Sequence, residues 1–139
     1  MYLNKSDLKK ACAELLADFN GVLSWKWDKN FGAFLAEFSA EIQDEVRSIL
    51  QRHLSQEWDR KTIRSAPDTL KTGAGEFGDL RSGQLLFTSD PESNVLILAA
   101  WWPWRDGEVV SVRIASPAEE SPDSEKIGIF ERLKDLFGR

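Results

Sequence analysis

The first twenty residues place their apolar side chains at the spacing of an α-helix. Within residues 5–19 the apolar positions recur every three or four residues, which brings them to one side of a helix. These positions are Leu8, Cys12, Leu15, Leu16 and Phe19. Asn20-Gly21 ends the helix. Residues 22–27 then alternate, with Leu23, Trp25 and Trp27 on one side, which fits a short strand and an extended lead-in equally well.

Residues 31–63 carry the longest helical pattern in the chain. On a helical wheel their apolar side chains fall within about half of the circumference. These side chains are Phe31, Phe34, Leu35, Phe38, Ile42, Val46, Ile49 and Leu50. A straight helix of this length would measure roughly 50 Å, whereas a compact chain of this size is only about 35–40 Å across. We therefore expect a long helix that bends or breaks between His53 and Trp58 and ends before Pro67.

The second half of the chain changes from the helical period to strand patterns. Residues 67–83 are rich in glycine and predict an irregular segment. Asp106-Gly107 is a tight hairpin signal between two apolar runs. Three strands are predicted in all, at residues 83–89, 95–104 and 108–116.

The last part of the chain predicts one more helix. Residues 116–124 form an acidic connector, and residues 124–137 are amphipathic at the helical period. We expect this C-terminal helix to pack on the sheet. The predicted fold is therefore a single α+β domain of residues 1–139, with N-terminal helices, a three-stranded antiparallel β-meander and a closing helix.

A two-residue turn at Asp106-Gly107 determines which residues lie opposite each other in the hairpin. It pairs Trp102 with Ser111 and Ala100 with Arg113, and paired residues share a face of the sheet. Arg113 is then diagonal to Trp102, where its guanidinium can stack on the indole ring. The opposite face is wholly apolar and is predicted core: Ile97, Ala99, Trp101, Pro103, Val110, Val112 and Ile114. Pro103 has no N–H to donate, so we expect that side of it to face an edge or a bulge.

The mixed face of the hairpin has three interpretations, which the sequence leaves open. A strand that is apolar on both faces is normally covered on both, here by the terminal helices. Alternatively, Trp102, Trp104 and Arg113 form an exposed platform, because Trp and Arg are enriched at binding hot spots. A homodimer across this face would give the same pattern.

Composition and charge exclude several classes of protein. The 139 residues include 18 basic and 23 acidic side chains, a net charge of −5, and the excess acid lies in the second half. No cluster of Lys and Arg suits a phosphate backbone, so we expect no nucleic-acid partner. The single Cys and single His exclude a disulfide framework and a thiolate zinc site, and we expect neither metal nor cofactor. Without a signal sequence or a membrane-spanning run, the chain is predicted to be cytoplasmic.

Three features that resemble functional motifs have structural interpretations. Residues 73–78 match G-x-G-x-x-G literally, but no strand precedes them and a strand follows where the helix should be, so a turn-forming loop is favoured over a nucleotide site. His53 lies on the apolar side of the predicted long helix, which is typical of a hydrogen-bonded core residue. Cys12 lies on the apolar side of the first helix and is predicted to be a buried thiol.

The sequence favours a small, non-enzymatic interaction protein with an accessory, chaperone-like or immunity-like role, of a kind that suits bacteria. Its partner face would carry Trp102, Trp104 and Arg113, helped by Trp25 and Trp27, and its negative charge would complement a basic protein partner. Two alternatives remain. One is a small-molecule binder or small enzyme, whose pocket between the sheet and the long helix uses Arg81, Gln84 and His53 behind a glycine-rich flap. The other is a structural homodimer.

Overall fold

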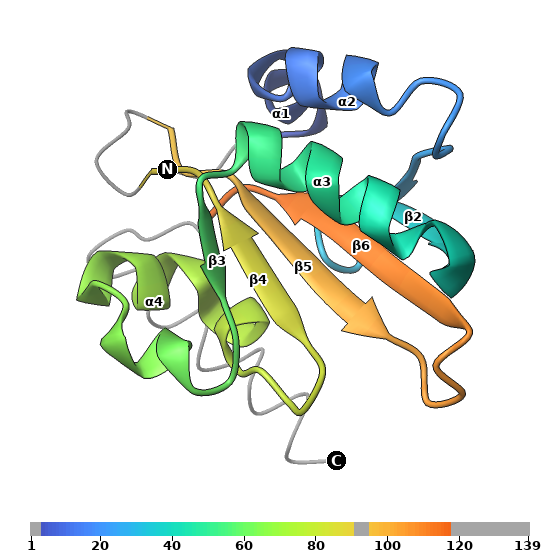
Figure 1. The fold of residues 1–139 in the computed structure, drawn as a ribbon. Helices are drawn as coiled ribbons and strands as arrows, with labels where there is room; N and C mark the ends of the chain where they lie inside the picture. Colours follow the sequence, from blue (N-terminus) through green and yellow to red (C-terminus); the bar gives the residue numbers. More distant parts are fainter. Residues whose placement is uncertain (1–3, 91–94, 118–139) are drawn as a thin grey trace.

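A six-stranded antiparallel sheet organises the residues that the computed structural model describes, which are 4–90 and 95–117. The strand order is β1-β2-β6-β5-β4-β3, so the three-residue strands β1 and β3 form the two edges and β6 and β5 lie at the centre. Every neighbouring pair is antiparallel (Figure 1). The strands are β1 (Lys26–Asp28), β2 (Ala33–Ser39), β3 (Gln56–Trp58), β4 (Leu85–Thr88), β5 (Leu98–Pro103) and β6 (Val109–Ala115).

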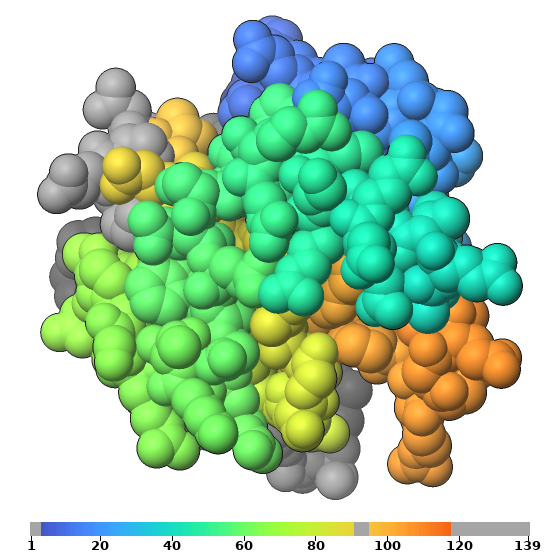
Figure 2. Space-filling view, in the orientation of Figure 1, coloured from blue at the N-terminus to red at the C-terminus, as the bar shows by residue number. Residues whose placement is uncertain are grey.

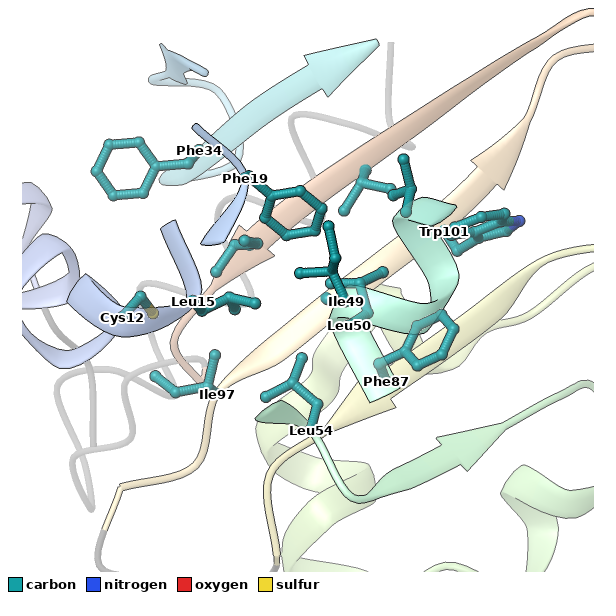
Figure 3. Close-up of a cluster of buried hydrophobic side chains, with 14 of the residues drawn as sticks. Cys12, Leu15, Phe19, Phe34, Ile49, Leu50, Leu54, Phe87, Ile97 and Trp101 are labelled. Atoms are coloured by element: carbon teal, nitrogen blue, oxygen red, sulfur yellow. The ribbon is translucent and has the colours of Figure 1, made fainter. Parts of the chain in front are cut away.

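Helices from the first half of the chain cover one face of the sheet. They are α1 (Lys5–Ala11), α2 (Ala13–Asp18) and α3 (Gln43–His53), with a 3-10 turn, η1 (Ala40–Ile42), leading into α3. In Figure 1, α3 lies across β5 and β6. Figure 3 shows the core between these helices and the sheet. Leu15 of α2 and Phe19, which follows α2, pack here with Ile49 and Leu50 of α3. The sheet contributes Phe87 and Trp101 to the same core. We call this the first core.

The segment between β3 and β4 forms a second core on the other face of the sheet. It consists of α4 (Asp68–Ala74) between two 3-10 turns, η2 (Thr62–Ser65) and η3 (Gly75–Gly78). Leu70 and Phe77 from this layer pack with sheet residues such as Leu86 and Leu98. Because side chains alternate along a strand, Leu86 lies in the second core and Phe87 in the first. The sheet is therefore the middle of three layers.

The predicted fold was wrong in the number of strands. The three predicted strands are present as β4, β5 and β6, but β1, β2 and β3 complete the sheet. The long helix was also wrong, because Ala33–Ser39 is a strand and only Gln43–His53 is α-helical. β2 is buried on both faces, with Phe34 and Phe38 in the first core and Ala33 in the second. A strand that is apolar on both faces has a near-continuous hydrophobic run, and such a run also fits a helical stripe.

Several smaller predictions have definite outcomes. The first helix is divided at Cys12 into α1 and α2, and the ambiguous residues before Asp28 end in the short strand β1. The helical chain does break after His53, as expected. The glycine-rich segment is not irregular, since it contains α4 and η3. The predicted C-terminal helix, residues 124–137, and most of its acidic connector lie outside the described residues.

The helices of the described part of the chain are all short. None of them is both long and apolar enough to cross a membrane.

Candidate functional site

The hairpin of β5 and β6 has the register that its turn predicts. Trp102 lies opposite Ser111 and Ala100 lies opposite Arg113. The predicted core face is confirmed for all of its members except Pro103, which is exposed. β4 pairs with β5 only as far as Trp101, so no β4 residue lies opposite Pro103 and its missing N–H falls at an open position, as expected. Trp102, Trp104 and Arg113 therefore share the second face of the sheet.

Arg113 is held between two aromatic rings. The centre of its guanidinium lies 4.8 Å from the ring centroid of Trp102 and 4.7 Å from that of Phe31, which confirms the predicted stacking on Trp102. Its Nε donates a hydrogen bond to Oδ2 of Asp28 at 3.2 Å. The two charged side chains are only 16% and 12% exposed. Phe77 of η3 packs against Phe31 and Trp102 as well, with centroids 5.7 and 5.6 Å away.

The Arg113 cluster, which consists of Arg113, Asp28, Phe31, Phe77 and Trp102, connects three parts of the fold. Asp28 ends β1, Trp102 lies in β5, and Phe77 belongs to the layer that covers the second face. A charged group at low exposure needs both a partner of opposite charge and contacts for its planar face, and Arg113 has both. Arg113 and most of Trp102 are therefore packed parts of the fold and not an open platform.

Trp104 differs from its neighbours because its ring is in contact with solvent. It is 46% exposed, and it is the only large apolar side chain among residues 4–90 and 95–117 to be classed as exposed. Its Nε1 donates a hydrogen bond to Oγ of the buried Ser111 at 2.7 Å. Its backbone N–H donates to the carbonyl of Val109 at 2.8 Å. The ring is thus fixed on the sheet face while its apolar surface stays open.

Two residues of β2 extend this surface across the sheet. Glu37 lies opposite Ser111 and Ser39 lies opposite Val109, so both side chains share the face that carries Trp104. Both are exposed, and Val109 is half-buried. We call Glu37, Ser39, Trp104 and Val109 the hairpin-end surface. In Figure 2 the orange hairpin projects from one corner of the molecule next to the teal residues that follow β2.

Trp25 and Trp27 do not join the hairpin-end surface. Trp27 lies opposite Phe34 on the first face, and the two rings meet edge to face with centroids 5.0 Å apart. Trp25 packs on Phe19 at 5.4 Å, and its buried Nε1 has no hydrogen-bond partner among the described residues. The alternation of Trp25 and Trp27 was visible in the sequence. The face of the sheet on which they lie depends on the pairing of β1 with β2, which was not predicted.

The residues of the predicted pocket are not brought together around a cavity. Arg81 is exposed, and its backbone N–H donates to Oε1 of Gln84 at 2.9 Å in the turn before β4. His53 ends α3, where its Nε2 lies 2.6 Å from Oδ2 of Asp18 in α2. The predicted place of the pocket, between the sheet and the long helix, is filled by the first core. The flap is the ordered α4 and η3 layer.

A cavity of about 560 Å³ does lie beside Cys12, His53 and Leu54. Burial raises the pKa of the Cys12 thiol to about 12, so the thiol is neutral near pH 7 and is a poor nucleophile. Cys12 is a buried free thiol, as predicted. Within the part of the chain that the structure describes, no group of three or more His, Cys, Asp or Glu side chains could hold a metal ion.

The glycine motif also has a structural role in this fold. Gly73 lies in the last turn of α4, and Gly75 begins η3. The motif therefore begins inside a helix, where a nucleotide fold would have a strand before it. Gly75 has φ 55° and ψ −130°, a conformation that glycine adopts at little cost. A hollow of about 480 Å³ beside Gly75 and Gly78 is bordered by Arg64 and Lys71, but Lys71 is engaged with Asp68 and with the carbonyl of Arg64.

Comparison with known proteins gives no relative: no family model, no curated protein and no solved structure matches this chain. Function has to be inferred from the geometry of the described residues.

Proposed function

We propose that the protein is a non-enzymatic interaction module that binds a protein partner through the hairpin-end surface. The observation that carries this proposal is Trp104, which is open to solvent and held in place by its hydrogen bond to Ser111. A large ring that is already ordered loses little conformational freedom on binding, and Trp is the residue type most enriched among interface hot spots. Arg113 and Trp102 lie on the same face of the sheet, packed against Phe31.

The charge around Trp104 favours a basic partner. Asp106 and Glu108 lie in the turn of the same hairpin, Glu37 shares its face, and all three are exposed. Arg105 is the one basic side chain of the turn. The whole chain has a net charge of −5, which speeds encounter with a positively charged protein. An accessory or chaperone-like protein, or an immunity protein against a basic toxin, has this combination of properties.

The alternative functions have less support. A small-molecule site between the sheet and α3 loses its cavity, because the first core fills that space. A homodimer across the hairpin-end surface uses the same ring, and light scattering of the purified protein with and without Trp104→Ala separates it from binding of a different protein.

The test is capture of a partner by the full chain and by the single variant Trp104→Ala. Trp104 is exposed, so we expect the variant to keep the far-ultraviolet circular dichroism of the wild type. Trp102 is left intact, because its ring packs on Arg113, Phe31 and Phe77. The control is Arg52→Ala, at an exposed position of α3 on the first face.

We expect a stoichiometric basic protein that is captured by the wild type and by Arg52→Ala and is lost with folded Trp104→Ala. Retention of the same protein by Trp104→Ala would place the interface elsewhere. Absence of any such protein, together with a Trp104-dependent dimer in light scattering, would favour self-association.

A further inference from the structure

The outer edge of β2 is only partly covered by its neighbour β1. β6 pairs with β2 along its whole length, from Ala33 to Ser39, whereas β1 pairs only with Ala33, Phe34 and Leu35. Beyond Leu35, no strand among the described residues lies beside the outer edge of β2. The open stretch is residues 36–39, and it contains Glu37 and Ser39 of the hairpin-end surface.

The hydrogen-bond pattern shows which residues of this stretch face outward. The N–H of Ala40 donates to the carbonyl of Glu108 at 2.8 Å, so Ala40 and Glu108 stand opposite each other as a pair at a hydrogen-bonded position of the ladder, while the N–H of Glu108 donates to Asp106. In an antiparallel ladder such pairs alternate, which turns the backbone groups of Phe38 toward β6 and those of Glu37 and Ser39 away from it. The N–H groups of Glu37 and Ser39 therefore point to the open edge, and both of these residues have exposed side chains.

The other edge of the sheet is closed in a different way. β3 runs along β4 from Thr88 to Leu86, so it covers three of the four residues of β4. The side chain of Glu57 in β3 accepts hydrogen bonds from Arg47 and Gln51 of α3, and the indole of Trp58 donates to Thr88. Short, tied strands of this kind protect an edge against pairing. Among residues 4–90 and 95–117, no side-chain hydrogen bond of this kind holds a neighbouring strand against residues 36–39 of β2.

From this edge and its charge we infer that β2 takes an extended basic segment of the partner protein as an added strand beside Glu37 and Ser39. The inference rests on the proposed function and names the way in which the partner binds. Backbone hydrogen bonds would supply the affinity, and alternate side chains of the added strand would lie on the face that carries Glu37 and Trp104. Lys or Arg at those positions would meet Glu37, while Glu41 and Glu108, both exposed, lie next to the end of the open stretch.

A second copy of this chain is a poorer occupant of the same edge. Antiparallel pairing of two β2 edges about a two-fold axis would bring both Glu37 side chains and both Glu41 side chains to one seam. Like charges across a strand pair are destabilising, whereas a basic strand has the opposite effect. The edge thus discriminates against self-association and in favour of a basic partner.

Ser39→Pro tests the added strand by removing one backbone donor. Ser39 has φ −69°, which is the angle that proline imposes, and its N–H is not used in the ladder with β6. The variant also loses the hydroxyl that accepts a hydrogen bond from the N–H of Glu41 at 3.2 Å. Ser39→Ala is the matched control, because it loses the same hydroxyl and keeps the backbone N–H.

The probe is an acetylated, amidated peptide of four Lys-Val repeats, with a Glu-Val peptide as its charge-reversed control. The peptides are titrated into the isotopically labelled full chain and followed by amide resonances. We expect the Lys-Val peptide to shift the resonances of Glu37 and Ser39 and to slow hydrogen exchange at both amides. Ser39→Pro should bind the peptide about tenfold more weakly than Ser39→Ala does, which is the effect of one lost backbone hydrogen bond.

The inference is overturned if the Lys-Val peptide does not bind, if it binds away from β2, or if folded Ser39→Pro binds it as well as Ser39→Ala does. If Ser39→Pro does not fold, protection of the Glu37 amide in the wild type decides the question alone. A cellular partner that is lost with Trp104→Ala and retained by Ser39→Pro would refute the added strand and leave the proposed function standing. Peptide binding at β2 without any Trp104-dependent partner would refute the proposed function instead.

Discussion

Arg113 stabilises the fold through two kinds of contact at one residue. Its planar face lies between Phe31 and Trp102, and its edge donates to the carboxylate of Asp28. The carboxylate has a second role, since its Oδ1 accepts a hydrogen bond from the N–H of Asn30 in the turn between β1 and β2. Arg113 therefore contacts both Trp102 of the inner strand β5 and Asp28 of the edge strand β1.

Replacing Arg113 by methionine should destabilise the protein. The change keeps much of the apolar stem but leaves Asp28 poorly exposed and without its cation, and we expect a loss of about 2 kcal/mol in the free energy of unfolding. Urea denaturation measures this difference. Arg105→Met, at an exposed position of the adjacent turn, should change stability by less than about 0.5 kcal/mol.

The double variant Arg113→Met/Asp28→Asn separates the ion pair from the packing. If the pair is the main contribution, removing the second charge should restore part of the loss, with a coupling of about 1 kcal/mol. Strictly additive losses would assign the effect to the stacked rings alone.

Residue contacts within the hairpin could be predicted from the sequence, and contacts to other segments could not. The stacking of Arg113 on Trp102 followed from a two-residue turn and the alternation of side chains. Phe31 and Asp28 were missed because both lie in or beside a segment with the pattern of a helix. The difference in exposure between Trp102 and Trp104 was also beyond prediction, since alternation assigns a face and does not show what covers it.

At the scale of elements, the joint between α4 and η3 depends on one glycine. Gly75 has φ 55° and ψ −130°, whereas Gly78, three residues later, has no positive φ. A Cβ at Gly78 would lie 3.4 Å from the Cβ of Ala74, which is close to ordinary contact. The two glycines of the same motif therefore have different conformational requirements.

Gly75→Ala should destabilise the protein and Gly78→Ala should not. Alanine at Gly75 must adopt a strained backbone conformation, which costs about 1–2 kcal/mol. At Gly78 the expected change is within about 0.5 kcal/mol. Thermal unfolding of both variants measures the difference. Equal losses of stability at the two positions would contradict a conformational role for Gly75. The shared cause would then be the added methyl group at the hollow that both glycines border.

The elements that were predicted correctly are those with one clear pattern and a strong turn. β5 and β6 are joined by Asp106-Gly107 and have one purely apolar face, so the sequence determined their type and register. The prediction of β2 failed because burial on both faces removes the alternation of apolar and polar side chains over most of the strand. Only at its end do the polar residues Glu37 and Ser39 alternate with a buried residue. β3, with only three residues, has too few positions for any period to be recognised.

At the scale of the whole molecule, one sheet is shared by two cores. The four inner strands, β2, β6, β5 and β4, each contribute to both cores, and the neighbouring residues Leu86 and Phe87 on β4 are fully buried on opposite sides. Neither layer of helices has a core of its own without the sheet. The two cores are therefore expected to unfold together, and the single domain stays a prediction that this unfolding would test.

Leu86→Ala and Phe87→Ala test whether the two cores are coupled in this way. Each change creates a cavity in one core only, and each should lower the free energy of unfolding by about 3 kcal/mol. If the sheet couples the cores, both variants should shift the midpoint of urea unfolding without changing its slope, and the far- and near-ultraviolet circular dichroism should change together. Thr69→Ala, at an exposed position of α4, controls for changes in the layer that covers the second core. The opposite outcome is a Leu86→Ala protein whose second core unfolds at a lower urea concentration than its first core. That result would show two independent folding units, because the α4 layer would have unfolded while the sheet stayed folded.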